Sequence, residues 1–203
     1  MGTGLTERNR RRTRREIAEA AGQLFLERGY AAATVQDIAS AADVSPRTFF
    51  RYFPCKEDVI TAIASASMDD VLEHLAGHDV SESLVSVLKA TFAAVLGPAI
   101  DDPDAARAFQ FMLRDTPALR GRWLEEQRRN RDRLAEELRP WFDESSSAVA
   151  RHLAAGAALL AIDEVMTLWA DDPSRRDPLG LLHQALEILD GPSIFPKKRP
   201  KKR

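Results

Sequence analysis

The chain has 203 residues, of which 44% are hydrophobic and 30% are charged, and its formal net charge is -2. That apolar content can fill a buried core in one or two domains, which excludes an intrinsically disordered protein. Cys55 is the only cysteine, so an intramolecular disulfide is excluded, and the apolar run at residues 153–162 is far shorter than the roughly 20 residues that span a membrane. We therefore expect a soluble, cytoplasmic protein with no membrane partner.

Charge is distributed unevenly along the chain. Residues 1–56 hold ten Lys/Arg and six Asp/Glu, a net charge of +4, whereas residues 57–196 hold 13 and 25, a net charge of -12. Residues 197–203 hold six basic residues and no acidic residue. A basic head on an acidic body is expected when one end of a protein contacts phosphates. A DNA-packaging protein would be basic throughout, so the acidic body argues against that class.

The first predicted helix covers about residues 9–28, and Gly29 ends it. Its apolar stripe has the i, i+3, i+4, i+7, i+8 spacing of a face turned toward a core: Ile17, Ala20, Ala21, Leu24 and Phe25. Its outer face is rich in arginine: Arg10, Arg11, Arg12, Arg14 and Arg15. Taken alone, such a run is as often a solvated face as a binding surface.

Residues 34–56, TVQDIASAADVSPRTFFRYFPCK, predict two short helices separated by a tight turn. Thr34 is a good N-cap for a helix over residues 34–42, and Asp43 lies where the chain must turn. Ser45 as N-cap and Pro46 at the first helical position are strong signals for a second helix over residues 45–52. This order of elements is typical of a helix-turn-helix DNA-binding module, in which the second helix enters the major groove.

The second of these helices has one face to bury and one to offer to DNA. Phe49 and Phe53 are predicted to point inward, while Arg47 and Thr48 lie at the exposed start and are the best candidates for reading bases. Thr34, Tyr52 and Lys56 are better suited to phosphates, and the arginines of the first helix can reach the adjoining backbone or minor groove as a flexible arm. The predicted DNA contacts are Arg10, Arg11, Arg14, Thr34, Ser45, Pro46, Arg47, Thr48, Phe50, Arg51, Tyr52 and Lys56.

This region resembles the TetR-type one-component bacterial regulators. The resemblance covers about residues 14–59 and rests on Val44, Ser45, Phe49, Phe50, Tyr52, Phe53, Lys56 and Glu57. It implies an all-α fold with a helix-turn-helix DNA-binding domain at residues 1–55 and a helical ligand-binding and dimerisation domain at residues 56–192. Residues 193–203 are then a basic tail that we predict to be disordered. Two positions depart from the family pattern, because Asp43 replaces the usual turn glycine and Phe50 replaces an aromatic residue that often carries a hydroxyl.

Helical segments are expected throughout the rest of the chain, and we predict no strand. They cover residues 56–76, 81–96, 103–114, 117–141, 145–170 and 178–189. Alanines and Gly156 dominate residues 149–162, and a leucine stripe follows at residues 179–189. The resemblance implies a homodimer built from these last two long helices, although both can instead pack inside one subunit.

Large apolar side chains in the middle of the chain are candidates for an effector pocket. Any one of them can equally be ordinary core. Arg107, Arg114, Gln127 and Asn130 are polar groups that can orient a ligand. As a group these residues favour a small apolar or amphipathic effector, with a fatty-acyl compound as one example. The predicted ligand-binding residues are Phe92, Phe109, Met112, Trp123, Gln127, Met166 and Trp169.

No catalytic motif is recognisable, so we expect no enzyme, no cofactor and no metal site. His74 and His78 have the spacing of a metal pair, but Gly77 ends the predicted helix between them and no third ligand is evident. A thiol switch at Cys55 would lack a resolving cysteine. We therefore predict a ligand-responsive transcriptional regulator, by default a repressor that binds a palindromic operator as a dimer and is released by its effector. The alternatives are a transcriptional activator and a DNA-binding protein without an effector.

Overall fold

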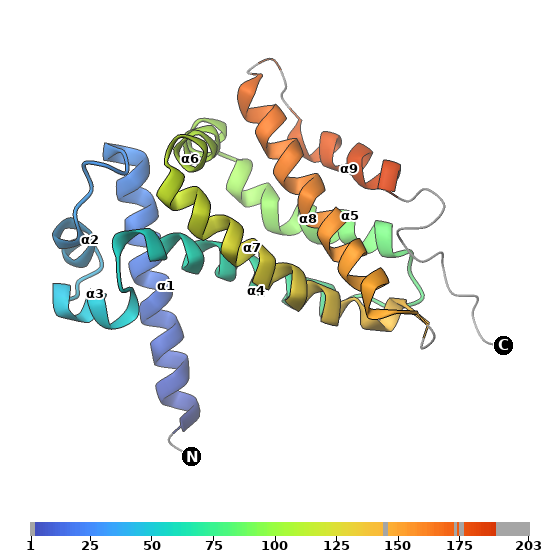
Figure 1. The fold of residues 1–203 in the computed structure, drawn as a ribbon, viewed down its shortest axis with the longest axis horizontal. Coiled ribbons are helices and arrows are strands. Elements are labelled where there is room, and N and C mark those ends of the chain that lie inside the picture. Colours follow the sequence, from blue (N-terminus) through green and yellow to red (C-terminus); the bar gives the residue numbers. More distant parts are fainter. Residues whose placement is uncertain (1–2, 144–145, 173, 175–176, 190–203) are drawn as a thin grey trace. The chain divides into compact units, whose positions relative to one another are not determined.

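The computed structural model describes residues 3–143, 146–172, 174 and 177–189. Across these ranges it contains nine α-helices, two short 3-10 helices and no strand (Figure 1). The helices are α1 (Thr3–Arg28), α2 (Val35–Ala41), α3 (Pro46–Tyr52), η1 (Lys56–Asp58), α4 (Val59–Ala76), α5 (Leu84–Ile100), α6 (Pro103–Asp115), α7 (Pro117–Glu137), η2 (Arg139–Trp141), α8 (Ala148–Asp171) and α9 (Pro178–Leu189). The predicted all-α fold class is confirmed, and the predicted tail at residues 193–203 lies outside the described residues.

Helix ends differ from the sequence expectations where no strong capping signal was present. Helix α1 starts at Thr3 instead of about residue 9, so Asn9 is an interior helical residue and the arginine run is helical rather than a flexible arm. The predicted fourth helix begins with the 3-10 turn η1, and α4 proper starts at Val59. Helix α7 ends at Glu137, and a separate turn carries Trp141.

The chain divides into two compact units that interleave along the sequence. Unit 1 comprises Met1–Ser67 and Phe111–Glu126, and unit 2 comprises Met68–Gln110 and Gln127–Arg203. Helices α4, α6 and α7 therefore each contribute residues to both units. The unit that holds the predicted helix-turn-helix is thus larger than residues 1–55 and includes a segment from the middle of the sequence.

The core of unit 1 joins α1, α2, α3 and the start of α4. Ile17, Ile38, Phe49 and Phe53 are fully buried in it, and the rings of Phe49 and Phe53 lie 5.5 Å apart. The predicted stripe on α1 faces this core, with Ala20 at its half-buried edge. Burial of these large side chains holds α3, a helix of only seven residues that would be unstable alone.

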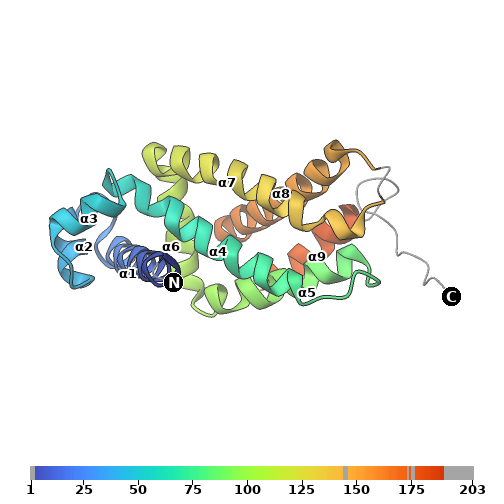
Figure 2. The same ribbon diagram turned by 90° about the horizontal axis from the view of Figure 1, so that it is seen from below.

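The core of unit 2 is built from α5, α8, α9 and parts of α4 and α7. Helix α9 packs against both α8 and α5 (Figures 1 and 2). The buried face of α8 consists mostly of alanines, which lets neighbouring helices approach closely. Helix α8 has the length and apolar composition to cross a membrane, contrary to the estimate from residues 153–162 alone. The buried part of this composition, mostly alanine, packs in the core of unit 2.

Candidate DNA interface and effector site

Helix α2 and the turn after it are fixed by local hydrogen bonds. The backbone N–H of Asp37 donates to Thr34 Oγ1 at 3.1 Å, and the Thr34 N–H donates to Asp37 Oδ2 at 3.0 Å, which forms a capping box. Hydrogen bonds from Thr34 hold the pKa of Asp37 below its ordinary value. Asp43 has a φ of 51°, so an aspartate does adopt the left-handed conformation of the turn, as predicted.

Helix α3 presents an exposed face of mixed character. Ser45 Oγ accepts a hydrogen bond from the Thr48 N–H at 3.1 Å, and Pro46 follows the cap, so the predicted helix start is confirmed. The Thr48 hydroxyl lies 3.0 Å from the Ser45 hydroxyl and is within hydrogen-bond distance of the cap. The outer face of α3 is therefore formed by other side chains. Those exposed side chains are Arg47, Phe50 and Arg51, with Phe50 54% exposed.

Lys56 has a structural role that the sequence did not predict. Its ammonium donates to the carbonyl oxygens of Tyr30 at 2.6 Å and Ala33 at 2.8 Å, and it lies 4.0 Å from the centre of the Tyr30 ring. Two of its three N–H groups are therefore used to tie η1 to the loop between α1 and α2.

Tyr30 makes a second link between the same two segments. Its hydroxyl donates a hydrogen bond to Glu57 Oε1, and this bond holds the pKa of Glu57 below its ordinary value. Burial and the neighbouring carboxylate raise the pKa of Tyr30. The loop after α1 is therefore fastened to η1 by both Lys56 and Tyr30.

The arginines of α1 have different environments. Arg14 Nη2 donates to Thr61 Oγ1 at 3.2 Å, and its guanidinium lies 5.2 Å from the centre of the Phe53 ring. Arg14 thus packs on α3 and α4 inside unit 1, which assigns it a structural contact in addition to the predicted DNA contact. Arg10 and Arg11 are exposed.

Unit 1 contains an ion pair that was not predicted from the sequence. Arg122 of α7 lies 3.0 Å from Asp58 of η1 and joins the second segment of the unit to the end of the helix-turn-helix. The partners are 64 positions apart in the sequence, so no local signal indicates this pair. Cys55 lies beside it, and burial together with nearby Glu57 and Asp58 raises the pKa of the thiol. The thiol is therefore less reactive than a helix dipole alone would make it.

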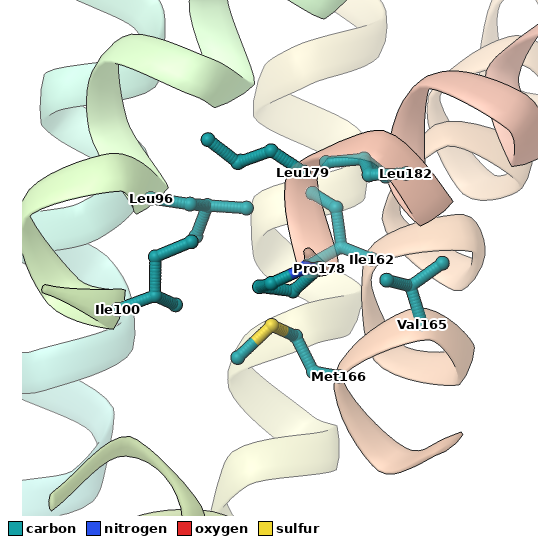
Figure 3. Close-up of a pocket in the computed structure, with 8 residues that line it drawn as sticks. All are labelled: Leu96, Ile100, Ile162, Val165, Met166, Pro178, Leu179 and Leu182. Carbon is teal, nitrogen blue, oxygen red and sulfur yellow. The ribbon is translucent and has the colours of Figure 1, made fainter. Parts of the chain in front are cut away.

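Unit 2 contains a narrow apolar hollow between α5, α8 and α9. Figure 3 shows Leu96 and Ile100 of α5 on one side, with residues of α8 and α9 opposite. The other lining residues are Ile162, Val165, Met166, Pro178, Leu179 and Leu182. In this conformation the hollow has no room for even a water molecule, whereas most small-molecule sites enclose roughly 300 to 1,000 Å³. Binding of any ligand here therefore requires α5, α8 and α9 to separate.

The predicted ligand-binding residues do not form one group in the structure. Met166 lines the hollow, and Trp169 follows it one turn later on α8. Phe92 is fully buried in the core of unit 2. Met112 and Trp123 belong to unit 1, where Met112 packs against the helix-turn-helix core.

Two further predicted residues, Phe109 and Gln127, are half-buried parts of unit 2 and are absent from the lining of the hollow. Five lining residues escaped the sequence analysis because they are ordinary aliphatic residues that meet only through packing of three helices: Leu96, Ile100, Ile162, Val165 and Pro178. Leu179 and Leu182 were noted only as part of a helix stripe. Among the described residues, no group of three or more His, Cys, Asp and Glu side chains is placed to hold a metal ion.

Comparisons with known proteins agree on one family. The family model of the bacterial regulatory proteins of the tetR family matches residues 17–63, which hold the helix-turn-helix. The HTH-type transcriptional regulator TcmR of Streptomyces glaucescens is 36% identical over 140 residues, covering 66% of this chain and 62% of TcmR. The HTH-type transcriptional repressor AcnR of Corynebacterium diphtheriae is 33% identical over 126 residues, covering 62% of this chain and 63% of AcnR. The chain thus spans less than two thirds of the length of these relatives.

A solved structure extends the similarity to both units. The transcriptional regulator FadR from Bacillus subtilis in complex with stearoyl-CoA is 25% identical, with a TM-score of 0.57, and the match covers 87% of this chain and 97% of FadR. The matching proteins are named as regulators of transcription, not as enzymes. The motif, the capped helices and these matches together identify residues 17–63 as a DNA-binding domain of the tetR family of bacterial regulatory proteins.

Proposed function

We propose that this chain is a cytoplasmic transcriptional repressor that binds a palindromic DNA operator as a homodimer and leaves it when a small apolar or amphipathic effector binds. The observation that carries the proposal is the outer face of α3. This helix is fixed to its unit through the buried Phe49 and a capped start, and it leaves Arg47, Phe50 and Arg51 exposed. A short helix held in this way is suited to enter the major groove.

Arg47 is the residue we expect to read a base. It lies one position after the start of α3, is exposed, and carries a guanidinium that can donate two parallel hydrogen bonds to guanine. Thr34, Tyr52 and the remaining N–H of Lys56 are suited to phosphates, with Arg10 and Arg11 of the basic helix α1 adding charge. Such contacts position the protein without selecting a sequence.

Dimerisation is supported by the free face of α8. Val149, Leu153 and Leu160 are 65%, 63% and 57% exposed, and Ile188 of α9 is 79% exposed. The three α8 side chains follow each other at helical spacing and make an apolar stripe that a second copy can cover. Gly156 lies between them in sequence but faces the Arg131 side chain of the same unit, 3.5 Å from an added Cβ, so it does not itself provide the contact.

Release by an effector is supported by the hollow and by the name of a structural relative. The hollow is lined only by apolar side chains and opens between helices of the unit that lacks the helix-turn-helix. FadR from Bacillus subtilis is described in complex with stearoyl-CoA, and AcnR is named a repressor. A fatty-acyl effector fits this chemistry, provided that α5, α8 and α9 separate beyond their present spacing. An activator, or a DNA-binding protein without an effector, would share the exposed face of α3. Neither alternative would need both release by an effector and repression.

The proposal is tested by binding purified protein to its own upstream intergenic DNA and to an unrelated duplex over a series of salt concentrations. We expect a palindromic footprint, and Arg47→Ala should weaken binding to it by about 1–3 kcal/mol and reduce the discrimination between the two duplexes. Arg120→Ala is the matched control, because Arg120 is an exposed arginine of unit 1 on α7. Equal and steeply salt-dependent binding to both duplexes would contradict sequence reading.

A further inference from the structure

Trp169 is a buried side chain with an unused hydrogen-bond donor. It is 1% exposed, and its indole Nε1–H has no hydrogen-bond partner among the residues that the structure describes. The indole N–H is a donor only, and leaving such a group buried without an acceptor is unfavourable. A buried donor of this kind is therefore a place where a ligand oxygen would bind favourably.

The unused donor lies beside the apolar hollow. Trp169 follows Val165 and Met166 by four and three residues on α8, and both of these line the hollow, so the three side chains share one face of the helix. On α9, His183 follows the lining residue Leu179 by four residues, and its Nε2 likewise has no hydrogen-bond partner in the described part of the chain. The hollow is thus apolar in its lining and flanked by unused polar atoms.

A cation stands over the same indole ring. The guanidinium of Arg107 lies 4.3 Å from the centre of the Trp169 ring. A guanidinium at this distance is attracted by the face of the ring and places positive charge next to the indole. The combination of an N–H donor and a nearby cation suits a ligand oxygen with negative or partial negative charge.

We propose that the effector is an amphipathic molecule whose apolar body occupies the hollow and whose acceptor oxygen, a carboxylate or carbonyl oxygen, receives a hydrogen bond from Trp169 Nε1 near Arg107. That the ligand acts as an effector rests on the proposed function, whereas the ligand site does not depend on it. The head group is recognised by Trp169, and the body by Met166 and the aliphatic residues around it. A cationic head would find no acceptor at this indole and would be repelled by Arg107.

The head group of the ligand would contact α6, a helix that contributes residues to both units. Arg107 lies on α6, whose first part belongs to unit 2 and whose residues from Phe111 onward belong to unit 1. Met112, on that second part, packs against the core of the helix-turn-helix. The head of the ligand therefore meets the helix that contributes to both units, whereas its apolar body meets only helices α5, α8 and α9.

Three probes with similar apolar chains separate these roles by isothermal titration calorimetry on the full chain: decanoate, 2-undecanone and decylammonium. We expect the two probes with an acceptor oxygen to bind about tenfold more tightly than decylammonium. Trp169→Phe should remove most of this preference while leaving decylammonium binding unchanged. Met166→Phe, which fills the hollow, should weaken all three probes together.

Trp141→Phe is the matched control. Trp141 is also a buried tryptophan of unit 2 whose Nε1 has no hydrogen-bond partner among the described residues, but it lies on η2 and does not line the hollow. Trp141→Phe should leave the preference for the two acceptor probes unchanged. If Trp169→Phe does not fold, Arg107→Gln tests the same site, because it should weaken decanoate more than 2-undecanone. Arg114→Gln removes the same charge from α6 within unit 1 and should change neither.

The outcomes distinguish this site from the proposed function. No preference for the acceptor probes, loss of the preference in Trp141→Phe or Arg114→Gln, or no binding of any probe would overturn the site. Selective binding that leaves operator affinity unchanged would support the site and contradict release by the effector. Selective binding by a chain that binds no operator would likewise leave the site standing while the repressor proposal fails.

Discussion

Helices α3 and α8 are placed by opposite means. Helix α3 has seven residues, one buried side chain, a serine cap and a proline start. Helix α8 has 24 residues and a buried face that is mostly alanine, and its N-cap Ser147 makes no side-chain capping bond. A few specific contacts fix α3, whereas extensive packing of small side chains fixes α8.

The faces left exposed by these two helices differ accordingly. On α3 the free side chains include Arg47 and Arg51, which suit a charged partner such as DNA. On α8 the free side chains include Leu153 and Leu160, which suit a second helix. Under the proposed function, each helix binds its partner through the side chains that its own packing leaves exposed.

The largest expected effect comes from removing the anchor of α3. Phe49→Ala should lower the free energy of unfolding of unit 1 by about 3–5 kcal/mol, because Phe49 is fully buried and its loss leaves a cavity. The measurement is urea unfolding followed by the fluorescence of Trp123, which belongs to unit 1. Phe50→Ala is the control on the same helix and should change stability by less than about 0.5 kcal/mol.

Equal losses for Phe49→Ala and Phe50→Ala would show that the exposed face of α3 also holds the helix in place. The division between an anchoring face and a binding face would then be wrong. A stable Phe50→Ala protein with weaker operator binding would instead sharpen the division, since Phe50 is 54% exposed and available to DNA.

A charge on the free face of α8 should have the next largest effect. Leu160→Glu should shift the chain toward monomer, because burial of a leucine contributes about 1.5–3 kcal/mol and a two-fold symmetric interface contains the residue twice. Sedimentation equilibrium measures the change in the dimer dissociation constant. The fold of the subunit should be kept, since this side chain is 57% exposed.

Leu124→Glu is the matched control for this change. Leu124 is 52% exposed, but it belongs to the part of α7 in unit 1, whereas the apolar stripe of α8 belongs to unit 2. It should leave the dissociation constant unchanged. An equal shift in both variants, or no shift in Leu160→Glu, would remove α8 from the interface.

Local signals made much of α3 predictable from the sequence. The caps at Thr34 and Ser45 act within three residues of their own position, and the inward direction of Phe49 and Phe53 follows from helical spacing. The left-handed turn at Asp43 was predictable for the same reason. Caps, turns and the inward or outward direction of helical side chains depend on neighbouring residues, so a short stretch of sequence predicts them.

Contacts between distant segments were not predictable in this way. Lys56 bonds to carbonyls 23 and 26 residues earlier, and Arg14 bonds to Thr61, 47 residues later. Before these partners are placed, each residue is simply a cation near a DNA-binding motif. The assignment of Met112 to unit 1 likewise depends on how the helices pack, because its local pattern is that of any core residue.

The smallest expected effect concerns the link between Tyr30 and Glu57, which holds the loop before α2 to the turn after α3. Tyr30→Phe should lower the stability of unit 1 by about 1 kcal/mol at pH 7, because it removes one hydrogen bond to a carboxylate that is partly screened by solvent. Urea unfolding at a series of pH values between 3 and 8 is the measurement. Tyr52→Phe removes a hydroxyl from α3 and serves as the control.

The pH dependence gives this prediction its sign. The folded-state pKa of Glu57 is lower than its unfolded value of about 4.3, so the link stabilises the folded chain above that pH and the stabilisation is lost as the pH falls through the folded-state pKa. The difference between wild type and Tyr30→Phe should therefore narrow on acidification, whereas the difference for Tyr52→Phe should stay constant. A Tyr30→Phe difference that is independent of pH would mean that the tyrosine stabilises unit 1 through packing of its ring and not through its hydrogen bond to Glu57.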